Sequence, residues 1–244
     1  MAALPNSSLM AEPAVLESLR SESIMSTATI NPHQELIEKI PPASTLILHE
    51  ISWEEYEEIL DALGEAKGLR VSYDQGTLQI MTLSTRHEKY ARLIDTLVSL
   101  FSITRRIKVL CYGSATMKKE QKLKGAEPDS CFYVQNAELV GRKSDIDFSI
   151  DPAPDLVVEV DLEHDSLSKF PLYAALGVNE IWRYDGQFLT IYHLTQGQYV
   201  AAPASQALPE LSSGTLTEFL SRSHREDQYE VLLAFENWLQ GHEQ

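Results

Sequence analysis

The strongest hydrophobic pattern in the chain lies just before its midpoint. Apolar side chains recur there at intervals of three and four residues, which places them on one face of a helix; they are Tyr90, Leu93, Ile94, Leu97, Val98 and Phe101. Ser84 precedes this stripe and can cap the helix. A second helix is predicted from Ser52 to about Leu63, because Ser52 and Glu55 have the spacing of a capping box and Gly64 can end the helix.

Short runs of β-branched and aromatic residues predict the strands. Two runs, 70–73 and 77–82, flank Asp74-Gln75-Gly76, which predicts a hairpin. The run 155–160 is apolar except for Glu159, a pattern typical of a strand buried on both faces of a sheet. This order of elements predicts an α/β or α+β fold, with a mixed sheet flanked by helices. The other predicted strands are 108–112, 130–134, 180–184 and 190–194.

Composition divides the chain into three predicted parts. Residues 1–43 are rich in Ser, Ala, Glu and Pro and are expected to form a flexible extension. Residues 44–222 are expected to form the folded domain, and residues 223–244 a helical tail that docks on it through apolar side chains. The hydrophobic fraction of 43% is enough for a core.

Charge and cysteine content limit the functional classes. A net charge of −16 opposes nucleic-acid binding unless basic groups gather locally. The dense basic stretch, 118–124, could contact phosphates, but we expect it to lie in a solvated loop. Cys111 and Cys131 lack the spacing of a zinc site, and we expect reduced thiols. No apolar run approaches the ~18 residues of a membrane span and no signal peptide is recognisable, so we expect a cytoplasmic protein without membrane contact.

Glu159 is the residue whose surroundings most need an explanation. Its neighbours in Leu156-Val157-Val158-Glu159-Val160 favour burial. An ionised carboxylate is costly to bury unless it is paired or binds a metal, and such carboxylates mark functional sites more often than chance. The alternative is a structural salt bridge, with Lys169 or Arg183 as the partner.

Lys169 follows this strand at the start of the next predicted helix, 168–176. Ser168 can cap that helix, and Pro171 then lies in its first turn, where proline costs no hydrogen bond. From this position Lys169 can reach back over the edge of the sheet. The alternative is a solvated lysine on the surface.

Asp129, Asp155 and His87 are weaker candidates from local sequence. Each aspartate follows a proline at the start of a predicted strand, where proline is tolerated, so each dipeptide by itself indicates a strand start. His87 lies near the edge of the apolar stripe of its helix and can face the sheet. Glu88 points largely away, and the helix dipole alone favours an acidic residue in the first turn.

Taken together, these segments resemble the Uma-type family of restriction endonucleases, a branch of the PD-(D/E)xK nucleases in the restriction-endonuclease-like superfamily. The resemblance covers about Ser52 to Leu220 and implies a core of helix, three strands, helix and strand. It rests on Glu127-Pro128-Asp129, on Ala153-Pro154-Asp155-Leu156-Val157-Val158-Glu159-Val160, on Asp165-x-x-x-Lys169-x-x-x-Tyr173, and on Gly177-Val178-x-Glu180-x-Trp182.

The resemblance implies roles for five residues. Asp129 and Glu159 are then ligands of Mg²⁺, or of Mn²⁺ in its place, with the Val160 carbonyl as a third ligand. Lys169 positions the attacking water. His87 matches a position at the start of the family's first helix, which makes it a further candidate catalytic residue.

Two features depart from the family's pattern. The acidic segment Asp161-Leu162-Glu163-His164 follows the Glu159 strand, and Asp161 stands where the family's lysine usually lies. Pro171 in the next helix is also unusual for the family. Both departures keep open an inactive or altered site.

Three functions therefore compete. The first is a Mg²⁺-dependent endonuclease that hydrolyses phosphodiester bonds in DNA, as a homodimer by analogy with enzymes that cut both strands. The second is a catalytically silent protein of the same fold that binds or regulates. The third is a protein without nuclease ancestry, in which Glu159 and Lys169 form a buried salt bridge and Asp129 lies elsewhere.

Overall fold

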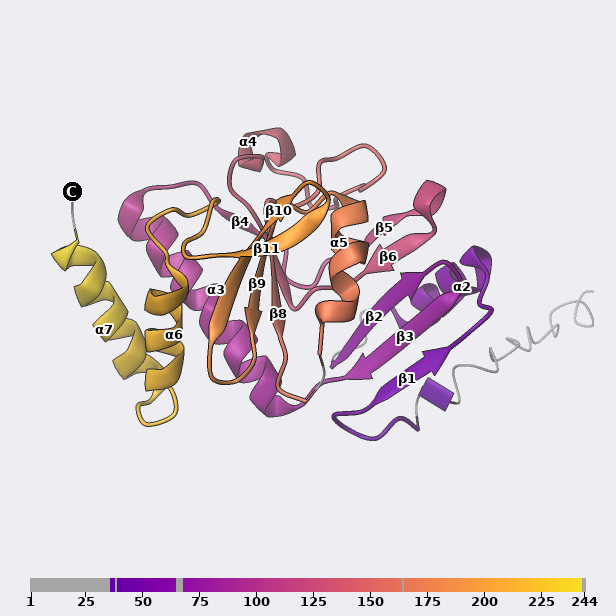
Figure 1. Ribbon diagram of the computed structural model, residues 1–244, viewed down its shortest axis with the longest axis horizontal. Helices are drawn as coiled ribbons and strands as arrows, with labels where there is room; N and C mark the ends of the chain where they lie inside the picture. Colours follow the sequence, from indigo (N-terminus) through magenta and orange to yellow (C-terminus); the bar gives the residue numbers. More distant parts are fainter. Residues whose placement is uncertain (1–35, 38, 65–67, 164, 243–244) are drawn as a thin grey trace, which may run out of the picture.

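The computed structural model describes residues 36–37, 39–64, 68–163 and 165–242, and its strands form two sheets that lie side by side (Figure 1). Most of the predicted extension, 1–43, lies outside the described residues. The division into an extension, a domain and a tail therefore stays a prediction.

The first sheet has, among the described residues, five strands in the order β1-β3-β2-β6-β5, and all neighbours are antiparallel. At the predicted hairpin between β2 and β3, Gln75 and Gly76 have positive φ angles of 47° and 94°, as a tight turn between twisted strands requires. Helix α2 (Trp53–Leu63) packs on this sheet, and its Ser52–Glu55 capping box is formed. The strands are β1 (Thr45–Leu48), β2 (Leu69–Asp74), β3 (Thr77–Thr82), β5 (Met117–Lys119) and β6 (Lys124–Ala126).

The second sheet is mixed and holds the candidate site. Within the described part of the chain it has six strands in the order β11-β10-β9-β8-β7-β4; β8 and β9 are parallel and the other pairs antiparallel. A mixed sheet flanked by helices confirms the predicted fold class, whereas the separate first sheet was not predicted. The strands are β4 (Leu110–Cys111), β7 (Ser130–Tyr133), β8 (Leu156–Val160), β9 (Glu180–Tyr184), β10 (Leu189–Thr195) and β11 (Gln198–Ala202).

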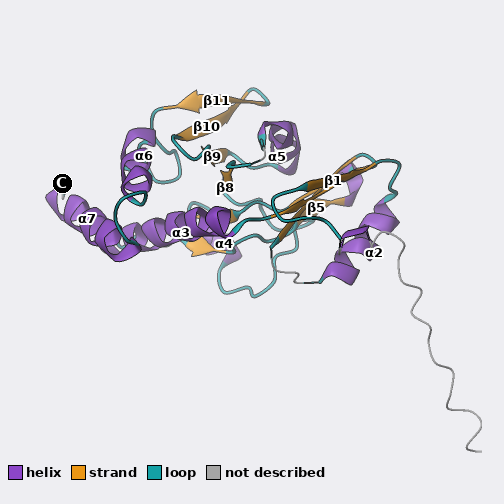
Figure 2. Cartoon of the chain, turned by 90° about the horizontal axis from the view of Figure 1, so that it is seen from below, coloured by secondary structure: helices purple, strands orange, loops and turns teal. Residues whose placement is uncertain are grey.

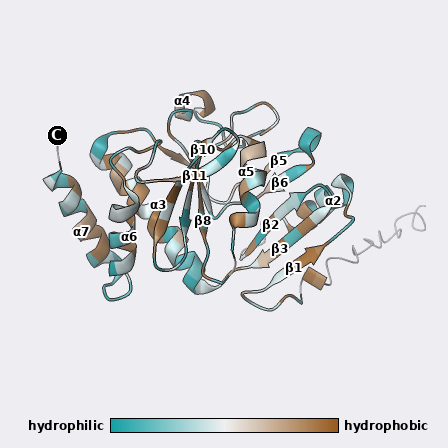
Figure 3. Ribbon diagram, viewed as in Figure 1, coloured by the Kyte–Doolittle hydropathy of each residue, from teal (hydrophilic) through white to brown (hydrophobic). Residues whose placement is uncertain are grey.

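Helices cover both faces of the mixed sheet. Helices α3 (Thr85–Arg105), α6 (Ser213–Arg222) and α7 (Gln228–Gly241) share one core with it, and α5 (Phe170–Leu176) forms a second core on the opposite face (Figure 2). Both α3 and α7 alternate between hydrophobic and hydrophilic residues along their length (Figure 3), as expected for helices with one buried face. A short helix, α4 (Ala137–Val140), follows β7.

Strand β8 contributes to both cores because successive side chains of a strand point to opposite faces. Leu156, Val158 and Val160 lie in the core with α3, and Val157 lies in the core with α5. Glu159 alternates with Val158 and Val160 and therefore points to the side of α5. The alternation of side chains along β8 therefore explains why the apolar neighbours of Glu159 are buried on the opposite face of the sheet.

Two helix starts bear on the site. Ser84 caps α3 as predicted, accepting a hydrogen bond from the amide of His87 at 3.1 Å. The predicted cap by Ser168 is wrong: a 3₁₀ turn, η3 (Leu167–Lys169), precedes α5, and α5 begins without a side-chain cap. Pro171 still lies in the first turn of α5, as predicted, where its missing amide is not needed.

The basic stretch 118–124 does not form a solvated loop. It forms β5, a 3₁₀ turn η2 (Glu120–Lys122) and the start of β6, and its lysines contact the chain itself. Lys119 and Lys122 donate to carbonyls at the C-terminus of α5, where positive charge stabilises a helix. Lys118 pairs with Glu57 and Lys124 with Asp74. No helix within the described ranges is long and apolar enough to cross a membrane.

Candidate active site

Asp129 and Glu159 lie opposite each other at one end of the β7–β8 pair. Ser130 pairs with Val158, so Asp129, one residue before β7, comes opposite Glu159. The amide of Asp129 donates to the carbonyl of Val158 at 3.0 Å. Directly opposed residues of antiparallel strands point to the same face, and both side chains are about 1% exposed. The sheet register therefore brings together the two carboxylates that the sequence separates by 30 positions.

Lys169 and Tyr173 contact Glu159 from the side of α5. The Lys169 ammonium lies 3.2 Å from Glu159 Oε1 and 3.0 Å from Oε2, and the Tyr173 hydroxyl donates to Oε1. Tyr173 follows Lys169 by four positions, which places both on one helical face. Lys169 is 6% exposed, so the alternative of a solvated surface lysine is wrong.

Asp129 is held by three groups from three parts of the chain. Its Oδ2 accepts from the Val160 amide at 2.8 Å and lies 3.0 Å from His87 Nε2. Its Oδ1 accepts from Arg70 Nε at 3.1 Å. The contact between His87 and Asp129 meets the distance of an ion pair. Neither ring nitrogen of His87 has the geometry of a hydrogen bond to a described residue. Asp129 therefore lies at the centre of the site, whereas the third hypothesis required it to lie elsewhere.

Burial and neighbouring charges push the pKa values of the two carboxylates apart. Burial raises the pKa of Glu159 to about 7; the Lys169 charge opposes this shift and the Asp129 charge adds to it. Burial also raises the pKa of Asp129, but His87, Lys169 and Arg70 outweigh it and hold that pKa below its ordinary value. Two carboxyl groups with separated pKa values in one buried site are typical of catalytic centres.

The same carboxylates raise the pKa values of two basic residues of the site. Burial lowers the pKa of Lys169, yet Glu159 and Asp129 raise it above its ordinary value. Burial also lowers the pKa of His87, and Asp129 raises it above the ordinary value of a histidine.

Asp161 fixes the loop between β8 and η3. Its Oδ2 accepts from the amide of Ser166 at 2.9 Å and from the Ser166 hydroxyl at 3.0 Å, and Arg183 Nε also donates to it. Arg183 lies on β9 beside Glu159. Asp161 therefore positions the turn that carries Lys169. It stands at the sequence position where the family's lysine usually lies, but its side chain has this structural role.

Arg70 and Tyr173 were not predicted as site residues. Arg70 lies on β2 in the first sheet, and only the packing of the two sheets brings it to Asp129. Tyr173 belongs to the quoted Lys169-x-x-x-Tyr173 motif, and its spacing from Lys169 was the signal that could have identified it. The only local signal at Arg70 was a charged residue at the start of the predicted strand 70–73.

Asp155 and Glu127 of the quoted motifs have structural roles. Asp155 accepts from the Val134 amide at 2.7 Å and from the amide and side chain of Asn136 at 3.0 and 2.6 Å. Glu127 accepts from the Val71 amide at 2.9 Å and from the Thr116 hydroxyl at 2.7 Å. These carboxylates satisfy backbone donors that would otherwise be buried without a partner.

Replacing Asp155 by alanine is expected to lower stability and leave the site intact. The amides of Val134 and Asn136 lose their acceptor, which costs roughly 2 to 6 kcal/mol at about 1–3 kcal/mol per unsatisfied group. The midpoint of urea unfolding measures this loss. Unchanged stability would show that water replaces the carboxylate, and the exposed Asp145→Ala serves as the control.

The site has the donor types that a small divalent cation prefers. Asp129 and Glu159 offer carboxylate oxygens, and Mg²⁺ is often held by one or two carboxylates while it keeps several waters. Among the described residues no group of three or more His, Cys, Asp and Glu side chains converges as a ready cation site. The two carboxylates therefore fit a cation of this kind, provided that some of their present contacts exchange. Val160 contributes its amide to Asp129, and a ligand role for its carbonyl stays a prediction.

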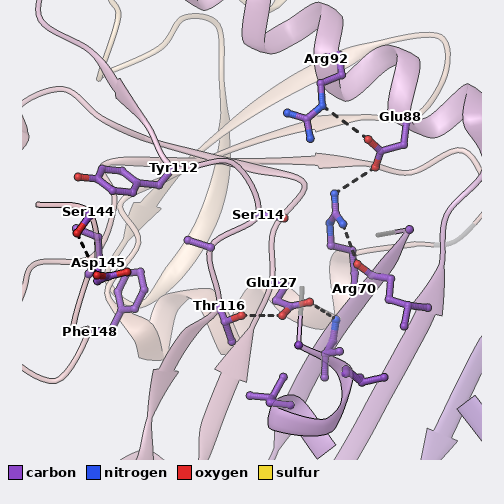
Figure 4. A pocket seen from close by; sticks show the side chains of 18 residues that line it. Arg70, Glu88, Arg92, Tyr112, Ser114, Thr116, Glu127, Ser144, Asp145 and Phe148 are labelled. Carbon is purple, nitrogen blue, oxygen red and sulfur yellow. Dashed lines mark hydrogen bonds and ion pairs between the residues drawn. The ribbon is translucent and has the colours of Figure 1, made fainter. Parts of the chain in front are cut away.

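A cavity of about 760 Å³ is lined by residues of α2, β2 and α3 and by the segments around Thr116 and Ser144 (Figure 4). Arg70 lines this cavity and touches Asp129. In Figure 4 Glu88 lies between Arg70 and Arg92, with Arg70 Nη2 3.4 Å from Glu88 Oε1 and Arg92 Nε 3.7 Å from Glu88 Oε2. Glu88 therefore lines the wall of the cavity. From sequence alone, Glu88 was predicted to point away from the sheet on which its helix packs.

Comparison with known proteins identifies related sequences and structures. The model of the Uma2 family, described as "Putative restriction endonuclease", matches residues 53–221. A solved structure from Anabaena variabilis ATCC 29413, described as "a putative nuclease belonging to DUF820", matches with 16% identity and a TM-score of 0.45, over 62% of this chain and 90% of that one. No curated protein matches the chain. The family match spans all the residues that converge at the site.

Proposed function

Since the chain belongs to the Uma2 family, described as "Putative restriction endonuclease", we propose that it is a Mg²⁺-dependent endonuclease that hydrolyses phosphodiester bonds in DNA. The observation that carries the proposal is the convergence of Asp129 and Glu159, from adjacent strands, with the Lys169 ammonium 3.0 Å from Glu159. Restriction-endonuclease-like enzymes generally use divalent metals. Mn²⁺, with similar oxygen preference, is expected to replace Mg²⁺.

The proposed ligands are Asp129 and Glu159, with the carbonyl of Val160 as a third. Mg²⁺ bound there would make a water more acidic and stabilise the negative charge that develops on the phosphate. His87 and the Val160 amide hold Asp129 Oδ2, so the carboxylate keeps one orientation. In this way the chain orients its ligands before the substrate arrives.

Lys169 would act on the substrate through its charge. Its ammonium lies beside Glu159, where it can stabilise an attacking water or the scissile phosphate. Tyr173 donates a hydrogen bond to Glu159 Oε1 from the side of α5 and so helps to fix the carboxylate. Burial of the whole group makes each of these charges more effective than it would be in water.

Metal dependence of DNA cleavage tests the proposed function. The purified protein is expected to cleave plasmid or linear duplex DNA with Mg²⁺ or Mn²⁺ and to stop when a chelator removes the ion. Calorimetry is expected to detect cation binding to the wild type and at least about tenfold weaker binding to Asp129→Ala, which lacks one ligand. Cleavage that continues in the chelator would reject the proposal.

A catalytically silent binding or regulatory protein is the second candidate. The observation that favours it is the closed arrangement of the carboxylates, whose four oxygens contact Arg70, His87, Lys169 and Tyr173. Such a protein would bind DNA or a partner without cutting. Binding of DNA in an electrophoretic shift, together with no cleavage under any metal condition, would select this candidate. A homodimer, expected for cutting both strands, is tested by sedimentation of the same samples.

A further inference from the structure

Arg70 contacts Asp129 Oδ1, the carboxylate oxygen that a bound cation would need. Its Nε donates to Asp129 Oδ1 at 3.1 Å, while Oδ2 is already held by His87 and the Val160 amide. Arg70 and Asp129 have side-chain exposures of 7% and 1%. A divalent ion at Oδ1 would lie close to this guanidinium, and the two positive charges would repel each other in a buried site.

Arg70 also contacts a second carboxylate, that of Glu88. Its Nη2 lies 3.4 Å from Glu88 Oε1, a longer contact than the one to Asp129, and Glu88 is 38% exposed on its side chain. The cavity of about 760 Å³ lies on the same side and is lined by both residues. A small rotation of the guanidinium would strengthen the contact with Glu88 and release Asp129 Oδ1. The backbone of β2 need not move, because arginine has enough rotatable bonds.

We propose that Arg70 is a movable positioning residue that closes Asp129 in the free protein and turns to Glu88 when a divalent cation binds. This inference rests on the proposed function, since it concerns the same cation. Arg70 then competes with the cation for one oxygen atom. It keeps the buried carboxylate paired when no cation is present, so that Asp129 is never an unpaired charge.

If Arg70 competes with the cation, the Arg70→Gln variant is expected to bind the cation more tightly than the wild type does. Loss of a competing contact of ordinary coupling strength corresponds to about 5- to 150-fold in affinity. The dissociation constants for Mg²⁺ and Mn²⁺ are measured by calorimetry on the full chain. A residue with only a structural role would give the opposite result, because its loss would loosen the site and weaken the binding.

Arg92→Gln is the matched control. Arg92 lines the same cavity and contacts Glu88 and Asp95. It removes the same charge from the same wall, so cation affinity is expected to change by less than about twofold, a difference within the spread of surface charge effects. A gain of equal size in both variants would mean that general repulsion, and not competition at Oδ1, limits the affinity, and would overturn the proposal.

A second measurement uses the wild type and does not require a folded variant. The Nε–H signal of Arg70 in a nitrogen-15 spectrum is expected to shift during a Mg²⁺ titration with the midpoint found by calorimetry, because Nε–H loses its hydrogen bond to Asp129 Oδ1. A signal that stays unchanged while the cation binds would overturn the proposal.

The outcomes separate this inference from the proposed function. Cation binding to the wild type with equal or weaker binding to Arg70→Gln leaves the function standing and rejects the role of Arg70. Absence of cation binding in both proteins rejects both. Tighter binding to Arg70→Gln, with an unchanged Arg92→Gln, supports both.

Discussion

Glu159→Gln is expected to reduce Mg²⁺-dependent cleavage of DNA by roughly a thousandfold, a loss of the size seen when one preorganised electrostatic group is removed from an active site. The substitution keeps the size of the side chain and an oxygen for Lys169 and Tyr173, but it removes the charge that would bind the cation. Single-turnover cleavage rates with saturating Mg²⁺ measure the effect, because they exclude a simple change in affinity for DNA.

Glu163→Gln provides the comparison for this variant. Glu163 lies four residues further along, on the exposed acidic segment after β8, and accepts a hydrogen bond from the Ser84 hydroxyl at 3.2 Å. The same change of charge there is expected to leave the cleavage rate within about twofold, since an exposed charge is screened. Equal rates for Glu159→Gln and the wild type, with both proteins folded by circular dichroism, would place the cleavage chemistry elsewhere.

Lys169→Met is expected to cause the largest loss of stability at the site. Removing one partner of a buried ion pair costs about 3 to 5 kcal/mol in the free energy of unfolding, because the other charge is left without compensation. Lys169 and Glu159 have side-chain exposures of 7% and 1%, so solvent cannot replace the lost partner. Urea unfolding followed by circular dichroism measures the free energy.

The loss in Lys169→Met should depend on pH in a defined direction. The pKa of Glu159 is about 7 in the folded wild type and 4.5 ordinarily, so the folded state holds a proton that the unfolded state has released between these values. The stability from that proton is complete below pH 4.5 and is lost as pH rises to about 7. Without Lys169 the folded pKa rises further, and the loss continues above pH 7. The variant is therefore expected to differ from the wild type more at pH 8 than at pH 5.

The double variant Glu159→Gln with Lys169→Met tests whether the effect of Lys169 on stability depends on its ion pair with Glu159. Removing the carboxylate charge takes away the reason for the destabilisation, so the double variant is expected to be more stable than Lys169→Met alone at pH 8. A double variant as unstable as the single one would show that Lys169 stabilises the protein through packing of its aliphatic part and not through Glu159. It would also remove the basis for the expected pH dependence.

Several features of the site follow from local sequence. An acidic residue inside Leu156-Val157-Val158-Glu159-Val160 indicated a buried carboxylate, and the structure places Glu159 between two cores. The capping signal at Ser84 fixed the start of α3 and with it the position of His87. These predictions succeeded because strand periodicity and helix capping depend on neighbours within a few residues.

Other features had no local signal. Asp155 has the same Pro-Asp context as Asp129, yet Asp155 binds the backbone at residues 134–136 while Asp129 lies at the centre of the site. The register of β7 against β8 makes this difference, and a shift of one residue would turn each side chain to the other face. The predicted cap at Ser168 failed because Asp161, itself held by the more distant Arg183, binds Ser166 and sets the path of the preceding turn.

The sequence by itself determined the helices with capping signals, the buried strand around Glu159, and the acidic and basic residues that could do chemistry. Only the tertiary structure decided which of those residues meet. Arg70 reaches Asp129 because two sheets pack side by side, and Lys169 reaches Glu159 because α5 covers one face of the mixed sheet. The physical reason is that secondary structure is set by short-range geometry, whereas the pairing of buried charges depends on contacts between segments far apart in the chain.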